Sequence, residues 1–170
     1  MQTEEFQRVF FEMKDKLYRF SLRIVRSSDQ AEDVVQEVMI KLWTKRDSME
    51  GIDNINGWLM VLARNLSIDK IRSKHHSTGS LETAYFVADG EIKPDKQAEQ
   101  SDLMQQIDAA VQQLPETQRL IFHLRDVEGM TYKEIGEILD LSLENVKVNL
   151  FRARQKLRKL LKQVESYGIS

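Results

Sequence analysis

The sequence predicts an all-α protein of two small helical domains joined by a flexible linker, with a helix-turn-helix in the C-terminal domain. Apolar residues recur at helical spacing in two stretches, and the stretch between them lacks any period. Glycine and proline are also scarce, at 7 and 2 of 170 residues, which favours helices over a β-sandwich or barrel. We place the domains at residues 1–75 and 103–170, with the linker at 76–102.

The N-terminal domain is predicted to contain three helices. Apolar residues at helical spacing predict a first helix over about Glu4–Arg26. Asp29 is a candidate cap for a second helix over Gln30–Lys45, and the polar stretch Arg46–Ile55 is typical of a loop. A third helix is expected from Asn56 to about Lys74. The three apolar faces are enough for one common core.

Periodicity is lost from about Ser73 to Ser101, which predicts a linker with local structure, if any, around Ala84–Val87. A helical stripe then returns over Leu103–Leu114. Pro115 suits the first turn of the next helix, about Glu116–Val127, because its missing N–H has no partner there anyway.

The C-terminal end has the pattern of a helix-turn-helix. Thr131 and Glu134 form a T-x-x-E capping box that starts the first helix of the motif. Gly136 lies inside this helix, where glycine is unfavourable, so we expect a close approach of the crossing helix there. Leu141 and Ser142 make the turn, with Ser142 as the cap of the second helix.

The second helix is strongly basic and suits the DNA major groove. Between Val146 and Lys162 it contains seven cations and no acid. Residues at the start of such a helix reach base edges, and cations further along meet phosphates. The candidate base contacts are Ser142, Asn145, Lys147, Asn149 and Arg152. Arg154, like Lys156 and Arg158, is a candidate phosphate contact or surface charge. Thr131 completes the candidate DNA-binding set.

The formal net charge of −2 is unusual for a protein that holds DNA alone, since affinity for duplex DNA comes largely from neutralised phosphates. We therefore expect weak duplex binding by the isolated chain and dependence on a larger partner.

Several classes of function find no support in the sequence. No cysteine is present to form a disulfide, a thiolate metal site or a thiol nucleophile. We see no signal peptide and no apolar run near the ~20 residues that a membrane helix needs, so we expect a cytoplasmic protein without direct membrane insertion. His75 and His76 are adjacent and point apart on a helix, so no metal is expected. No phosphate loop, nucleophile elbow or paired catalytic carboxylates appear, and we expect neither an enzyme, a cofactor nor a small-molecule substrate.

Three segments carry a family resemblance. LPETQRLIFHLRDVEGMTYKEIGEILDLSLENVKVNLFRARQKLRKLL resembles the promoter-binding C-terminal domain of bacterial RNA polymerase sigma factors. DQAEDVVQEVMIKLW (Asp29–Trp43) resembles their polymerase-binding helix, and NGWLMVLARNLSIDKIR (Asn56–Arg72) is similar to their −10 helix. The order and spacing match the extracytoplasmic-function group of the sigma-70 family over nearly the whole chain except the linker.

The resemblance implies roles for residues that would otherwise be read as solvated surface or core. It implies that residues on the second helix dock on the clamp helices of the polymerase β′ subunit, while Trp43 is expected in the core. It also implies that the loop after this helix captures a flipped −10 base, although which loop residue forms the pocket stays open. The polymerase-binding set is Asp33, Gln36, Glu37 and Lys41, and the −10 set is Trp58, Arg64, Asn65, Asp69 and Arg72.

The recognition helix departs from a common family pattern at Val148 and Asn149, where many members carry Arg or Ser. Asparagine favours adenine and arginine favours guanine, so the preferred −35 sequence is expected to differ. The resemblance further implies contact with the polymerase β flap and restraint by an anti-sigma factor.

Two other classes of protein remain alternatives at this point. One is a free-standing helix-turn-helix regulator that binds a palindromic site as a dimer. The other is a helical adaptor that binds only protein, whose binding would be unaffected by charge reversal at Lys147 and Arg152.

Overall fold

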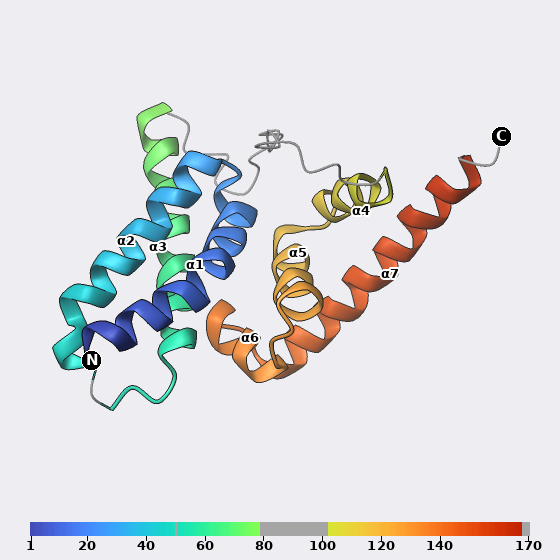
Figure 1. Cartoon of the computed structure of the whole chain (residues 1–170). Coiled ribbons are helices and arrows are strands. Elements are labelled where there is room, and N and C mark those ends of the chain that lie inside the picture. Colours follow the sequence, from blue (N-terminus) through green and yellow to red (C-terminus); the bar gives the residue numbers. More distant parts are fainter. Residues whose placement is uncertain (50, 79–101, 168–170) are drawn as a thin grey trace. The chain divides into compact units, whose positions relative to one another are not determined.

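The computed structural model describes residues 1–49, 51–78 and 102–167, and the chain separates into two compact units, Met1–Lys93 and Pro94–Ser170 (Figure 1). Every regular element in the described ranges is helical, which confirms the predicted fold class. The local structure expected around Ala84–Val87 lies outside the described residues.

The first unit is a three-helix bundle of α1 (Thr3–Val25), α2 (Ser28–Lys45) and α3 (Ile55–Thr78), with a short 3₁₀ turn, η1 (Arg46–Ser48), after α2. Each helix contacts the other two. The apolar stripes predicted from the sequence face the shared core, because each one lies at helical spacing on one side of its helix. Its fully buried side chains include Met13, Leu17, Phe20, Val34, Val38, Leu42, Leu59 and Met60.

The main differences from the sequence prediction in this unit are the cap of α2 and the extent of α3. Ser27, not Asp29, caps α2: the Ser27 hydroxyl accepts a hydrogen bond from the Gln30 N–H at 3.4 Å. Asp29 falls in the first turn, where its charge complements the helix dipole. The third helix begins one residue early and continues to Thr78, beyond the predicted start of the linker at residue 76.

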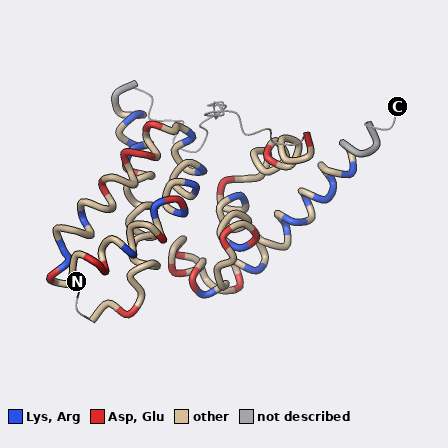
Figure 2. Tube along the Cα trace, viewed as in Figure 1, with Lys and Arg blue, Asp and Glu red and all other residues tan. Residues whose placement is uncertain are grey.

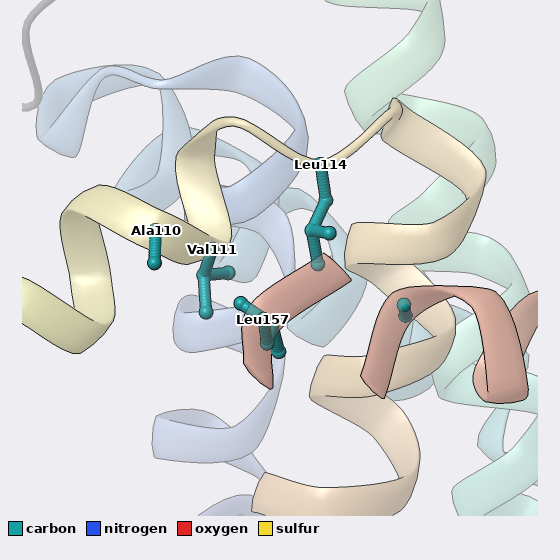
Figure 3. Packing of buried hydrophobic residues seen from close by; sticks show 5 residues of the cluster. Ala110, Val111, Leu114 and Leu157 are labelled. Atoms are coloured by element: carbon teal, nitrogen blue, oxygen red, sulfur yellow. The ribbon is translucent and has the colours of Figure 1, made fainter. Parts of the chain in front are cut away.

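The second unit contains α4 (Asp102–Gln112), α5 (Glu116–Phe122), the π-helical turn η2 (His123–Val127), α6 (Tyr132–Leu139) and α7 (Leu143–Tyr167). The long helix α7 contacts α4, α5 and α6, so it is the common support of this unit. Figure 3 shows Leu157 of α7 beside Ala110 and Val111 of α4 and Leu114, with which it forms one buried cluster. Removing these apolar surfaces from water stabilises the unit.

The predicted helix over Glu116–Val127 is instead an α-helix followed by a wider turn. In this turn the Glu128 N–H donates to the His123 carbonyl at 3.0 Å, five residues back, as in a π-helix. Pro115 lies just before α5, as its N-cap, rather than inside its first turn. The turn ends at Gly129, whose φ of +71° suits a residue without a Cβ.

Candidate nucleic-acid interface

The predicted polymerase-binding residues share one exposed face of α2. At about 3.6 residues per turn, Asp33, Gln36 and Glu37 lie opposite the buried residues of this helix. Lys41 lies at the edge of this face, and its ammonium is 3.5 Å from the Glu37 carboxylate. An exposed pair of this kind adds little stability, so these side chains stay available to a partner.

The sequence reasoning missed an apolar residue at the centre of this α2 face. Ile40 is 64% exposed and lies one turn after Gln36 and two turns after Asp33. It was detectable in the sequence, because it is out of phase with the apolar stripe that contains Val38 and Leu42. A large exposed apolar side chain with polar neighbours is typical of a protein interface.

Trp43 is not in the core as expected: it is 39% exposed. Its ring meets Phe6 edge-on, with 5.0 Å between the centroids, and the Arg46 guanidinium lies 4.3 Å from the ring centroid. Trp43 therefore joins α1 to the end of α2 at the surface.

Four of the predicted −10 residues lie along one side of α3. Trp58 is half-buried, and Asn65, Asp69 and Arg72 are exposed on the same side at helical spacing. Arg64 points elsewhere around the helix, although its Nη1 lies 3.4 Å from Oδ1 of Asn65. The structure thus groups Trp58, Asn65, Asp69 and Arg72 and leaves Arg64 at the margin.

The start of α3 is fixed by a cap that the sequence reasoning did not identify. The Asn54 side-chain oxygen accepts from the Gly57 N–H at 2.8 Å, and the Asn54 carbonyl accepts from the Trp58 N–H at 3.1 Å. A Cβ at Gly57 would lie 2.5 Å from the Asn54 amide nitrogen. Glycine therefore makes room for the cap that orients Trp58 at the end of the loop.

The capping box predicted for α6 is present. The Thr131 hydroxyl accepts from the Glu134 N–H at 3.2 Å, and the Glu134 carboxylate accepts from the Thr131 N–H at 2.8 Å. The Thr131 hydroxyl also donates to this carboxylate at 2.9 Å. The exposed Thr131 therefore has its hydroxyl engaged on both its donor and its acceptor side.

The turn between α6 and α7 explains Gly136. A Cβ there would lie 2.7 Å from the Leu141 carbonyl oxygen and 3.8 Å from Cγ2 of Val146. The sequence analysis expected a close approach of the crossing helix, but the close approach is chiefly to the turn itself. Asp140 adopts a left-handed φ of 55°, and Ser142 caps α7 as predicted, accepting from the Asn145 N–H at 3.2 Å.

The predicted DNA-binding residues of α7 fall on two sides of the helix. Asn145, Asn149 and Arg152 share one side by helical spacing, and the Asn149 amide donates to the Asn145 carbonyl at 2.8 Å. Lys147 and Arg154 lie on the other side. The buried residues Val146, Leu150, Ala153 and Leu157 lie between these two sides on one face of the helix, and the exposed Val148 and Phe151 lie between them on the opposite face.

The second side of α7 forms a shallow pocket beside the first residue of α6. Tyr132 lies against it, with the Arg125 guanidinium 4.7 Å and the Lys147 ammonium 5.9 Å from its ring centroid. The pocket is lined by Tyr132, Lys147, Leu150, Phe151, Arg154, Gln155 and Arg158.

Arg154 is held by Asp126 of the π-helical turn. Its Nε and Nη2 donate to the two carboxylate oxygens at 3.0 and 2.6 Å. This hydrogen bond, aided by the negative charge, raises the pKa of Arg154 against the opposing effect of partial burial. Because an arginine is already charged at any physiological pH, the raised pKa adds no pH dependence in that range.

The basic character of the site is concentrated on α7. Figure 2 shows Lys and Arg along this helix, with the stretch from Val146 to Lys162 free of acids. Among the described residues no cluster of three or more His, Cys, Asp or Glu could hold a metal ion. Within the same ranges, no helix is long and apolar enough to cross a membrane.

Comparison with known proteins identifies both units. Residues 10–77 match the family model for sigma-70 region 2, and residues 104–157 match that for sigma-70 region 4. The chain is 30% identical over 161 residues to the ECF RNA polymerase sigma factor SigW of Bacillus subtilis, covering 89% of this chain and 86% of SigW. It is also 30% identical over 144 residues to the ECF sigma-E factor of Escherichia coli K12, covering 79% of this chain and 75% of that protein.

Solved structures share the fold of this chain. The sigma factor RpoE of Bartonella quintana, in complex with the anti-sigma factor NepR, matches with a TM-score of 0.75 at 27% identity, over 94% of this chain and 98% of that one. CnrH, in complex with the cytosolic domain of CnrY, shares the fold with a TM-score of 0.67 at 18% identity, over 95% and 90% of the two chains.

These matches cover both helical units and decide against a free-standing regulator or an adaptor that binds only protein. The chain therefore belongs to the extracytoplasmic-function group of the sigma-70 family, and it is not an enzyme but a factor that directs RNA polymerase to promoters for transcription initiation.

Proposed function

We propose that the exposed face of α2 is the docking surface for the clamp helices of the polymerase β′ subunit. Asp33, Gln36 and Glu37 supply acceptors and a donor for a polar partner, and Lys41 lies at the edge. Ile40 at the centre supplies the apolar anchor. Acidic and amide groups around such an anchor select a basic, helical partner surface.

We further propose that the exposed side of α3 binds the −10 element. Single-stranded DNA is bound by stacking on aromatic rings and by polar groups that read exposed base edges. The half-buried Trp58, fixed by the Asn54 cap, is suited to stacking, and Asn65 and Arg72 supply polar and cationic groups along the same side. Asp69 and Arg64 complete the proposed set.

The −35 element is proposed to bind α7 in its major groove. The observation that supports this assignment is that Asn145, Asn149 and Arg152 share one side of α7, the helix that begins directly after the capped turn. Amides and a guanidinium are the groups that read adenine and guanine edges. Ser142 in the turn, Thr131 at the start of α6 and Lys147 on the other side of α7 are proposed to contact the DNA backbone.

Three further properties complete the proposal. The solved relative from Bartonella quintana is held by an anti-sigma factor, and we propose an anti-sigma factor for this chain as well. We also propose that it acts in the cytoplasm, where RNA polymerase works, with the β flap as the polymerase contact of its second unit.

Run-off transcription on genomic fragments tests the residue assignment. Wild-type chain plus core polymerase should give discrete transcripts without any other sigma factor. Asn149→Ala together with Arg152→Ala should abolish start-site selection, and Lys159→Ala, a cation lost further along α7, serves as the matched control. Unchanged selection by the Asn149/Arg152 variant would contradict the −35 assignment.

A further inference from the structure

Within the described part of α7, Arg154 differs from the other cations in having a carboxylate partner from a distant part of the chain. Its guanidinium makes two hydrogen bonds to Asp126, 28 positions away. The side chains are 41% and 28% exposed, so neither is fully open to solvent. We propose that Asp126 and Arg154 are positioning residues that hold α7 at the angle needed in the groove, and that Arg154 is not a DNA contact.

The inference rests on the proposed −35 role of α7 and deepens it. Two-point pairing between guanidinium and carboxylate fixes orientation as well as distance. A guanidinium held in this way has a neighbouring negative charge and two of its donors occupied. Arg154 is therefore a poor phosphate ligand, whereas Arg152, two residues earlier, lies on the Asn145 and Asn149 side.

Two consecutive side chains of the π-helical turn η2 contact the two helices of the helix-turn-helix motif, one contacting α6 and the other α7. Asp126 pairs with α7, and the preceding residue, Arg125, donates from Nη1 to the Met130 carbonyl at 2.7 Å. The Arg125 guanidinium also lies 4.7 Å from the ring centroid of Tyr132, the first residue of α6. Consecutive side chains of one turn thus hold the start of α6 and the middle of α7.

The wider turn is what makes this arrangement possible. In a π-helical turn an extra residue is accommodated, which rotates the side chains that follow relative to a continuous α-helix. Here the His123 carbonyl accepts from the Glu128 N–H, and Arg125 and Asp126 fall between these two residues. The Lys147 ammonium also lies 5.9 Å from the Tyr132 ring centroid, so α7 contacts the start of α6 two turns before Arg154 as well.

Asp126→Asn is the discriminating variant, because positioning and direct contact predict opposite results. If Arg154 contacted phosphate, loss of the nearby carboxylate would remove a repulsive charge and leave binding equal or tighter. If the pair positions α7, loss of the two-point pairing weakens binding. Arg154→Lys adds a second test, since lysine keeps the charge but cannot form the paired bonds.

The experiment measures binding of the complete holoenzyme to a fluorescein-labelled duplex that carries the strongest start site from genomic run-off transcription. We expect about three- to tenfold weaker binding for Asp126→Asn and for Arg154→Lys. The charge swap Asp126→Arg/Arg154→Asp should recover most of the loss while placing an anion at position 154. Glu137→Gln, which removes a carboxylate from an exposed position on α6, should bind as wild type.

Two readouts separate positioning from general unfolding and from failure of the −35 assignment. Thermal unfolding by circular dichroism should show folded variants, and affinity for core polymerase alone should not change. Arg152→Ala tests the −35 assignment itself: if it binds DNA as wild type, that assignment fails. Equal or tighter binding by Asp126→Asn, or no recovery in the charge swap, overturns the positioning role.

Discussion

The exposed faces of α2 and α7 are built from different chemistry. On α2 an apolar centre, Ile40, has acidic and amide neighbours, whereas α7 has a run of cations without an acid between Val146 and Lys162 (Figure 2). A chain with a net charge of −2 thereby carries one surface suited to protein and one suited to a polyanion. The difference predicts that the two binding activities respond differently to salt and to mutation.

Charge reversal on α7 is expected to have the largest effect, because it should weaken promoter binding and leave the α2 face unaffected. Lys147→Glu with Arg152→Glu should weaken promoter binding by the holoenzyme about 100-fold or more, since a base contact and a backbone contact both become repulsive. Affinity for core polymerase should remain as in wild type. Titration of each variant into labelled core and then into labelled promoter duplex measures both, and parallel losses of the two affinities would break the comparison.

The converse variant places a charge at the centre of the α2 face. Ile40→Asp should weaken binding to core polymerase about 10- to 100-fold, because an anchor is lost and a carboxylate must be desolvated. The loss should persist at high salt, unlike that of the α7 variant. Phe11→Asp is the matched control: Phe11 is 66% exposed on α1, outside this face, and should leave affinity unchanged. Equal losses from both substitutions would rule out a specific anchor.

A smaller effect is expected where the turn approaches α6. Gly136→Ala should lower the free energy of unfolding of the second unit by about 1–2 kcal/mol, because overpacking against the Leu141 carbonyl outweighs the better helix propensity of alanine. Both tryptophans, Trp43 and Trp58, lie in the first unit. Urea unfolding should therefore shift by circular dichroism and not by tryptophan fluorescence. A stabilised variant would show that the turn can move away.

The smallest expected difference compares the helix caps of the two units. Thr131→Ala removes a reciprocal capping box and should destabilise the second unit by about 1 kcal/mol. Ser27→Ala removes a single long bond of 3.4 Å from the first unit and should cost about 0.5 kcal/mol or less. The two urea midpoints, read by circular dichroism and by tryptophan fluorescence, measure this ranking, which an equal or reversed order would contradict.

The elements themselves were predictable because each depends on signals close together in the sequence. The capping box at Thr131 and the Ser142 cap each span only four residues, and the apolar stripes repeat every turn. The cap of α2 was misassigned to Asp29 because Ser27 and Asp29 are both good capping residues within three positions. Local sequence gives little basis for choosing between them.

Features that depend on contacts between distant residues were not predictable. The pairing of Asp126 with Arg154 joins positions 28 residues apart that only the folded unit brings together. Ile40 was detectable as an apolar residue out of phase, but its exposed fraction required the packing of the three helices. The assignments of residues to −10 and −35 DNA remain predictions. The structure adds which of these candidate residues share one side of α3 and which share one side of α7.

The hydrogen bond from the Asn149 amide to the Asn145 carbonyl has a consequence for selectivity. It uses one of the two amide hydrogens and leaves the other hydrogen and the oxygen available. That remaining donor and acceptor are the pair that the major-groove edge of adenine requires. Because the Asn149 side chain is already restrained before it meets a base, it loses less rotational freedom on contact. We therefore expect Asn149 to discriminate adenine from the other bases at that base pair rather than to accept several bases.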